Sequence, residues 1–232
     1  MPERCLLYYI TDRSAFHANE STRRRCLLDK IAEAAASGVD YIQLREKDMS
    51  TRELEALARE ASRIIGDASE GHQPETALLI NSRTDLARAV GASGVHLPAN
   101  DVSPQDVLRT WELAAPRGQA ELDYEGSRRI PQISVSCHSA HEVAQAAAAG
   151  ATLALFAPVF EKKDAPEALT QGLSSFEQAA RVKIPVLALG GITMQNAESC
   201  LRAGAAGVAA IRLFQENEIA AVVGVLRNLR AV

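Results

Sequence analysis

The chain has 232 residues, of which 47% are hydrophobic and 23% charged, ordinary proportions for a soluble globular protein with a substantial core. A formal net charge of −4 at pH 7 does not favour nucleic acid or an anionic membrane as a partner, and no apolar run approaches membrane-spanning length. The four cysteines include no C-x-x-C pair and the first residues lack a signal peptide's apolar core, so we expect a cytoplasmic protein without disulfides or zinc.

Eight short, nearly continuous apolar runs recur along the chain and predict β-strands. Continuous runs, rather than alternating polar and apolar residues, are typical of strands that are covered on both faces. The predicted strands span residues 5–11, 41–45, 77–81, 94–97, 133–136, 153–159, 186–189 and 207–211.

Helical segments separate these strands. Ser-x-x-Glu pairs that fit the N-terminal capping box begin at Ser50, Ser139 and Ser174, and Pro104 suits a first helical turn. Glycines expected to end helices precede four strands, at Gly38, Gly94, Gly150 and Gly204. Eight such units predict a single (β/α)8 TIM barrel over residues 1–232, because a doubly wound open sheet would not normally need eight. Residues 68–76 and 114–131 are interpreted as insertions in surface loops.

Paired glycines follow the seventh predicted strand at Gly190 and Gly191, and Arg212 follows the eighth. In (β/α)8 barrels the loops after these two strands commonly bind phosphate through backbone N–H groups and a helix N-terminus. Glycine is expected there because a Cβ would keep the anion from the backbone. The pattern predicts a ligand that carries phosphate.

Barrel active sites lie at the carboxyl ends of strands, so residues at those positions are candidates for binding. After the second strand, alternation sends Gln43, Arg45 and Lys47 to one side. One amide and two cations suit a polar ring together with phosphate or pyrophosphate oxygens. The alternative is a solvated charged patch.

The third and fourth strands end at polar residues. Asn81 and His96 are candidates for hydrogen bonds to a heterocycle. Asp101 is a candidate ligand for Mg²⁺, which typically uses one or two carboxylates together with substrate phosphates. Capping of the helix that begins near Pro104 is an equally good interpretation of Asp101.

The fifth and sixth strands lead to residues that could take part in chemistry. His138 is a candidate general acid or base because the pKa of histidine lies near neutral pH. Cys137 is expected to be a buried packing residue, since no neighbour would lower its pKa. Lys162 and Lys163 lie in a charged loop that is either a lid over a negative ligand or an exposed linker.

Eight short motifs occur in a fixed order along the chain. They are Tyr9-Ile-Thr-Asp12, Gln43-Leu-Arg45-Glu-Lys47, Asn81-x-Arg-x-Asp-x-Ala87, Gly94-Val-His-Leu97, Ser136-Cys-His138-Ser139, Phe156-Ala-Pro-Val-Phe160, Gly190-Gly-Ile-Thr193 and Ala203-Gly-Ala-Ala-Gly207. With these motifs the chain resembles the thiamine phosphate synthase and thiazole tautomerase superfamily over essentially its whole length, apart from the two insertions.

The resemblance implies a synthase that joins an aminopyrimidine pyrophosphate to a thiazole phosphate with the help of Mg²⁺, releasing pyrophosphate and forming thiamine phosphate. By the same likeness, Arg45 and Lys47 hold the pyrophosphate, Gln43, Asn81 and Ser136 face the pyrimidine, Lys162 or Lys163 assists the leaving group, and Gly191 with the eighth-strand loop binds the thiazole phosphate.

The chain departs from the synthase pattern at three places. Ser82 stands where synthases usually carry a Mg²⁺-binding aspartate, which leaves Asp101 as the only matching ligand. Glu161-Lys-Lys-Asp164 replaces a Thr-x-Thr-Lys element, and Arg212 replaces a small hydroxyl residue.

Two alternatives to the synthase stay open. The tautomerase branch shifts a proton on a thiazole carboxylate phosphate with one base and no metal, and His138 fits that task. A barrel that only binds thiamine-type phosphates is the other. The synthase ranks first because four cations, Arg45, Lys47, Lys162 and Lys163, exceed what one monophosphate requires. The expected partners are small phosphorylated substrates, and a homo-oligomer is compatible with the sequence.

Overall fold

The strands of the chain form a closed ring in the computed structural model, which describes residues 4–68, 75–113, 130–161 and 169–229. They are β1 (Leu6–Ile10), β2 (Tyr41–Leu44), β3 (Ala77–Asn81), β4 (Gly94–Leu97), β5 (Gln132–Cys137), β6 (Leu153–Phe156), β7 (Val186–Leu189) and β8 (Gly207–Ala210). Each strand pairs in parallel with the next, and β8 returns to β1 through the register Leu6 to Gly207. The predicted (β/α)8 TIM barrel is confirmed.

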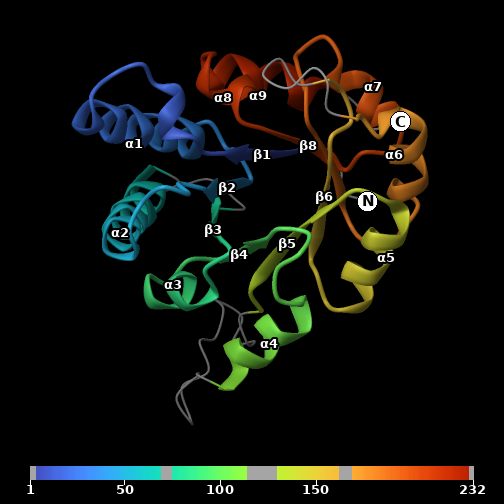
Figure 1. Cartoon of the computed structure of the whole chain (residues 1–232). Helices are drawn as coiled ribbons and strands as arrows, with labels where there is room; N and C mark the ends of the chain where they lie inside the picture. Colours follow the sequence, from blue (N-terminus) through green and yellow to red (C-terminus); the bar gives the residue numbers. More distant parts are fainter. Residues whose placement is uncertain (1–3, 69–74, 114–129, 162–168, 230–232) are drawn as a thin grey trace.

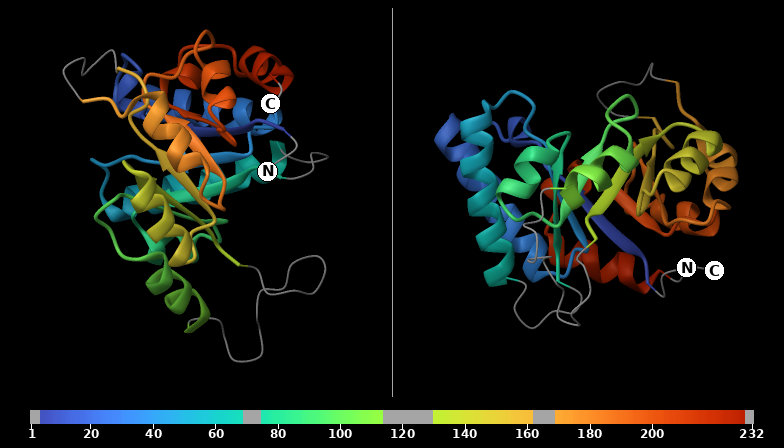
Figure 2. Two further views of the ribbon diagram at one scale, coloured as in Figure 1. Left: turned by 90° about the vertical axis from the view of Figure 1, so that its right-hand side faces the viewer. Right: turned by 90° about the horizontal axis from the view of Figure 1, so that it is seen from below.

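Helices surround this ring in chain order, with the strands at the centre (Figure 1). They are α1 (Glu20–Ala36), α2 (Thr51–Ala68), α3 (Thr84–Ala89), α4 (Pro104–Leu113), α5 (Ala140–Ala148), α6 (Gly172–Ala180), α7 (Ala197–Arg202), α8 (Arg212–Gln215) and α9 (Ile219–Asn228), and a 3₁₀ turn η1 covers Arg13–Ala15. On the outside of the barrel α1 and α2 lie side by side (Figure 2). No helix in the described part of the chain is both long and apolar enough to cross a membrane.

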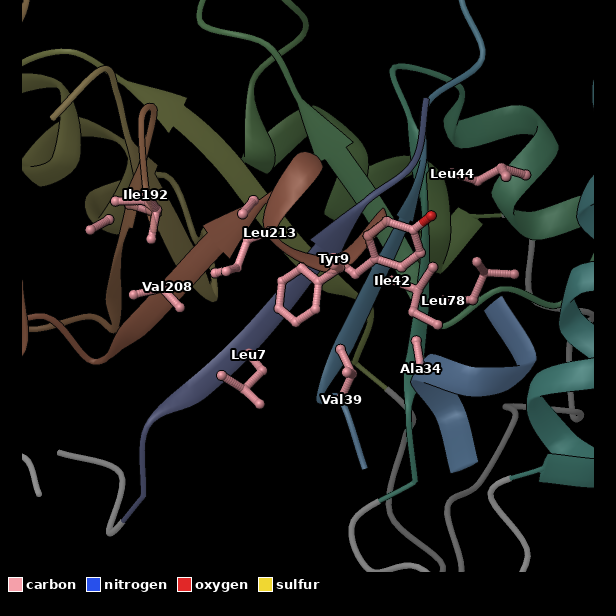
Figure 3. Close-up of a cluster of buried hydrophobic side chains, with 14 of the residues drawn as sticks. Leu7, Tyr9, Ala34, Val39, Ile42, Leu44, Leu78, Ile192, Val208 and Leu213 are labelled. Atoms are coloured by element: carbon pink, nitrogen blue, oxygen red, sulfur yellow. The ribbon is translucent and has the colours of Figure 1, made fainter. Parts of the chain in front are cut away.

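The main hydrophobic core lies between the outer face of the barrel and the helices. Successive residues of a strand point to opposite faces, so Leu7 and Tyr9 of β1 face this core, as do Ile42 of β2 and Val208 of β8 (Figure 3). Outward-facing residues of the strands and inward-facing residues of the helices are almost fully buried there. This packing holds the strand ends, and therefore the loops that follow them, in fixed positions.

The inside of the barrel has an apolar half and a polar half. Ile10, Leu155 and Leu187 belong to a second buried cluster contributed by β1 and β6–β8. Gln43 and Ser134, from β2 and β5, are also buried but carry hydrogen-bonding groups. Because buried polar groups need partners, the polar half is the natural place for a specific binding site.

Several predicted element boundaries hold, and some are wrong. Ser50 caps α2, which begins at Thr51, as expected, since the Ser50 N–H and hydroxyl both donate to the Glu53 carboxylate at 2.9 and 2.6 Å. Ser174 does not begin a helix, because α6 already starts at Gly172. The sixth strand ends at Phe156, three residues early, since Pro158 has no N–H to continue the ladder.

Gly94 is a second wrong prediction, because it opens β4 and does not end a helix. A Cβ at this position would lie 1.8 Å from the Gln132 carbonyl oxygen on the next strand, so close strand packing requires glycine. Gly91, with φ of +67°, is the glycine that follows α3. The two predicted insertions, residues 68–76 and 114–131, lie largely outside the described residues.

Candidate active site

A cavity of about 420 Å³ opens at the carboxyl ends of the strands. It brings together residues from opposite ends of the sequence. Its lining includes Gln43, Arg45, His96, Ser136 and His138 on one side and Gly190, Gly191 and Arg212 on the other. At least one predicted residue from each of the second, fourth, fifth, seventh and eighth strand ends therefore lines this one cavity.

Hydrogen-bonded side chains form the floor of this cavity. Gln43 is 1% exposed. Its Oε1 accepts from the Tyr8 hydroxyl at 3.2 Å, and its Nε2 donates to Asn81 Oδ1 at 2.9 Å. Asn81 Nδ2 in turn donates to Ser82 Oγ at 3.1 Å. Asn81 supports Gln43 and does not itself line the cavity.

His96 lies at the centre of the polar half. Its Nδ1 is 2.8 Å from Ser134 Oγ, and its Nε2 is 3.0 Å from Ser136 Oγ. Burial, together with the positive charge of Arg45, lowers the pKa of His96 to about 3. The imidazole is therefore neutral at physiological pH, with one ring nitrogen donating and the other accepting.

Arg45 is held at the rim through its backbone. Its N–H donates to Thr11 Oγ1 at 3.0 Å, and the Thr11 hydroxyl donates to Glu46 Oε1 at 2.6 Å. The Arg13 guanidinium contacts Glu46 and Asp48 at 3.2 and 2.6 Å, which ties the loop after β2 to the loop after β1. Burial raises the pKa of Glu46, and these donors offset part of that shift. The Arg45 guanidinium forms no ion pair with the described residues, which leaves it available to an anionic ligand.

The expected alternation does not extend to Lys47. The strand ends at Leu44, so the chain turns before it reaches this residue. Glu46 is buried instead, while Lys47 is exposed and does not line the cavity.

His138 lines the cavity and has one ring nitrogen tied to the backbone. Its Nδ1 lies 2.6 Å from the Ala157 carbonyl oxygen. Because a carbonyl oxygen can only accept, Nδ1 carries the proton, and Nε2 of the neutral ring has a free lone pair. The neighbouring Cys137 thiol is buried, and desolvation raises its pKa to about 12, so the expected packing role fits better than a nucleophilic one.

The backbone conformation and the close neighbours at positions 190 and 191 both require glycine. The φ angles of Gly190 and Gly191 are +95° and +64°, and a Cβ would lie 2.7 Å from Pro158 Cβ and 2.3 Å from the Glu161 carbonyl oxygen, respectively. Close contact with the loop after β6 thus explains these glycines without any ligand. Their N–H groups have no acceptor among the described residues, which also leaves them able to bind an anion.

The predicted metal ligand lies beside the cavity. Asp101 lines a separate hollow of about 250 Å³, and Ser136 borders both spaces. Asp101 Oδ1 accepts from the Val102 N–H at 2.8 Å. No group of three His, Cys, Asp or Glu side chains that could hold a metal occurs among the residues described. Lys162 and Lys163 lie outside the described residues.

Comparison with known proteins identifies the family. A family model described as thiamine monophosphate synthase matches residues 7–113 and 118–214. The chain belongs to this family. A thiamine-phosphate synthase from Roseiflexus sp. (strain RS-1) is 35% identical over 208 residues, which cover 89% of this chain and 76% of that protein. The thiamine-phosphate synthase of Methanoculleus marisnigri is 34% identical over 230 residues, 96% of this chain and 93% of that protein.

A solved structure supports the same placement. The thiamine phosphate pyrophosphorylase from Pyrococcus furiosus superposes with a TM-score of 0.73 at 26% identity, covering 98% of this chain and 96% of that one. The resemblance to the thiamine monophosphate synthase family, predicted from eight motifs, is therefore confirmed.

For this member of the thiamine monophosphate synthase family, sequence reasoning missed the residues below the rim. Tyr8 and Ser134 both lie in the middle of their strands, whereas the predicted site residues all lie at or after strand ends. A signal was present, since Ser134 is a polar residue between Ile133 and Val135. A hydroxyl within a buried run needs a partner, so such a residue marks the polar half of the barrel.

Proposed function

We propose that the chain is a thiamine-phosphate synthase that transfers an aminopyrimidine from its pyrophosphate to a thiazole phosphate. The observation that carries this proposal is the shared cavity, in which Arg45 and the segment at Gly191 and Arg212 line one space. Two phosphorylated substrates need two anion-binding regions with a polar floor between them. Membership of the thiamine monophosphate synthase family supports the same reaction.

Each residue then has a defined task. Arg45 binds the pyrophosphate through charge-assisted hydrogen bonds, while Gln43 and Ser136 contact the pyrimidine. The Gly191 N–H and the loop with Arg212 bind the thiazole phosphate. Because the reaction separates charge as the pyrophosphate leaves, fixed positive groups around it accelerate the reaction.

Mg²⁺ is part of this proposal. Asp101 would supply one carboxylate ligand, and the pyrophosphate and water would supply the rest, which agrees with the few protein ligands that Mg²⁺ uses. The ion would neutralise charge on the leaving pyrophosphate. Lys162 and Lys163 are proposed to assist the same group.

The test is release of pyrophosphate by the purified protein with both phosphorylated precursors and Mg²⁺. Arg45→Ala should lower the rate by about 10²- to 10³-fold, the scale expected for loss of a charge-stabilising donor. Arg59→Ala, which removes an exposed arginine of α2, is the matched control and should keep the wild-type rate. Absence of pyrophosphate with every divalent metal tried would refute the proposal.

His138 supports a second candidate, the thiazole tautomerase. His138 lines the cavity, and the Ala157 carbonyl holds a proton on its Nδ1, which leaves Nε2 as the nitrogen that could act as a general base. His138→Ala should then stop isomerisation of the thiazole carboxylate phosphate without weakening its binding, whereas the exposed His141→Ala should not. Turnover that survives His138→Ala would remove this candidate. If calorimetry shows tight binding of these phosphates but neither pyrophosphate release nor isomerisation occurs, a barrel that only binds them is favoured.

A further inference from the structure

The polar floor of the cavity is a continuous chain of hydrogen bonds whose direction can be worked out from one end. At the Gln43 end, Oε1 is a pure acceptor, so the Tyr8 hydroxyl must donate its proton to it. Tyr8 is fully buried, and burial raises the pKa of Tyr8 well above its usual value, which keeps that proton in place. With its proton used, the Tyr8 oxygen accepts from Ser134 Oγ at 2.9 Å.

The direction continues through His96. Ser134 has one proton and gives it to Tyr8, so its oxygen must accept from His96 Nδ1 at 2.8 Å. A neutral imidazole protonated on Nδ1 has a lone pair on Nε2. Ser136 Oγ, 3.0 Å away, therefore donates its proton to Nε2. The donor of every hydrogen bond between Gln43 and Ser136 is thus assigned.

The consequence falls on Ser136, which ends the hydrogen-bond chain and lines the cavity. The only hydroxyl proton of Ser136 is donated to His96, so toward a ligand in the cavity Ser136 can act only as a hydrogen-bond acceptor. We propose that this hydrogen-bond chain fixes Ser136 as an acceptor and so selects a heteroaromatic ligand that presents an N–H donor, rejecting the analogue with a carbonyl oxygen there. This inference rests on the proposed function, in which the ligand is an aminopyrimidine.

Tyr8 and Ser134 are positioning residues in this proposal. Ser134 acts on the ligand through His96, whereas Tyr8 acts through Ser134 and through Gln43, to which it donates; neither Tyr8 nor Ser134 lines the cavity. Without the Tyr8 hydroxyl, Ser134 is free to turn its proton toward Nδ1. The imidazole can then carry its proton on Nε2, and Ser136 can donate into the cavity. A change remote from the ligand is thus expected to change which hydrogen-bonding group the site prefers.

The first test is spectroscopic and needs no substrate. The ¹⁵N shifts of the His96 ring, assigned by comparison with His96→Asn, should show a proton on Nδ1 and none on Nε2. Tyr8→Phe should populate the Nε2–H form. Tyr9→Phe is the matched control, because the next residue faces the outer core and its buried hydroxyl has no partner in the described structure. A wild-type ring protonated on Nε2 would overturn the proposal.

The second test compares the aminopyrimidine pyrophosphate with its oxo analogue as substrates. The wild type should prefer the amino compound by about 100-fold in kcat/KM, because the carbonyl oxygen of the oxo analogue and Ser136 are both acceptors and cannot form a hydrogen bond with each other. Tyr8→Phe and Ser134→Ala should reduce that preference by about tenfold, the worth of one hydrogen bond, while Tyr9→Phe should keep it. An unchanged preference in both variants would refute the hydrogen-bond chain. Lack of turnover with the amino compound would instead refute the proposed function, and the ring protonation would still be decided by the first test.

Discussion

Acidification should destabilise this protein through one buried histidine. His96 is 4% exposed, and burial lowers its pKa to about 3, against about 6.5 in an unfolded chain. Below pH 6.5 the unfolded state therefore binds a proton that the folded state excludes. Stability is complete above pH 6.5 and falls until the pH reaches about 3. Between pH 8 and pH 5 the two pKa values give a loss of about 2 kcal/mol in the free energy of unfolding.

Urea unfolding at pH 8 and pH 5 measures this loss. His96→Asn keeps a polar side chain but has no imidazole to titrate. The loss in its free energy of unfolding between pH 8 and pH 5 should therefore be about 2 kcal/mol smaller than the loss in the wild type. Other titrating groups are common to both proteins and cancel in the comparison. His141→Asn removes an exposed imidazole of α5 and should keep the wild-type pH dependence. Equal pH dependence of the wild type and His96→Asn would refute the reasoning.

Four further substitutions test the packing and the buried polar contacts. Gly191→Ala places a Cβ 2.3 Å from a backbone oxygen at a φ of +64°, and should lower the free energy of unfolding by about 2 kcal/mol or more, whereas Gly66→Ala, in an open position of α2, should raise it by about 0.5–1 kcal/mol. The reverse order of stability would contradict this reading. Tyr9→Phe should stabilise the protein by about 1 kcal/mol, because the buried hydroxyl has no partner in the described structure; a clear loss in thermal unfolding would reveal an unrecognised partner. Arg227→Met removes donors that lie 2.7 and 2.8 Å from the Gly38 carbonyl and the buried Asp40 carboxylate, and should cost about 2–3 kcal/mol in urea unfolding, so a change below about 0.5 kcal/mol would argue against these contacts.

The barrel could be predicted from the sequence because its strands are apolar on both faces and its helices begin and end with clear signals. The third, fourth and seventh strands have the predicted bounds. Errors arose where one residue type serves two purposes. Gly94 resembles a helix C-cap but is needed for close contact between strands, and Ser174 has a capping-box spacing inside a helix.

The candidate site was predictable at the rim and not below it. Arg45 and His138 follow strands in sequence, and the barrel brings all such positions to one mouth. Lys47 was placed by extending the strand alternation past the point where β2 ends. The partners of His96 could not be found in this way, because the register between β4 and β5 decides which serines reach its ring.

Closure of the barrel has a consequence for synthesis of the chain. One edge of β1 pairs only with β8, whose first residue, Gly207, lies opposite Leu6. At about 5–20 residues per second a ribosome needs about 10–40 s to make the intervening chain. Throughout that interval the nascent first strand has an unfilled row of backbone donors and acceptors, a feature from which aggregation begins. Slower synthesis of the segment between β1 and β8 should therefore lower the yield of folded protein.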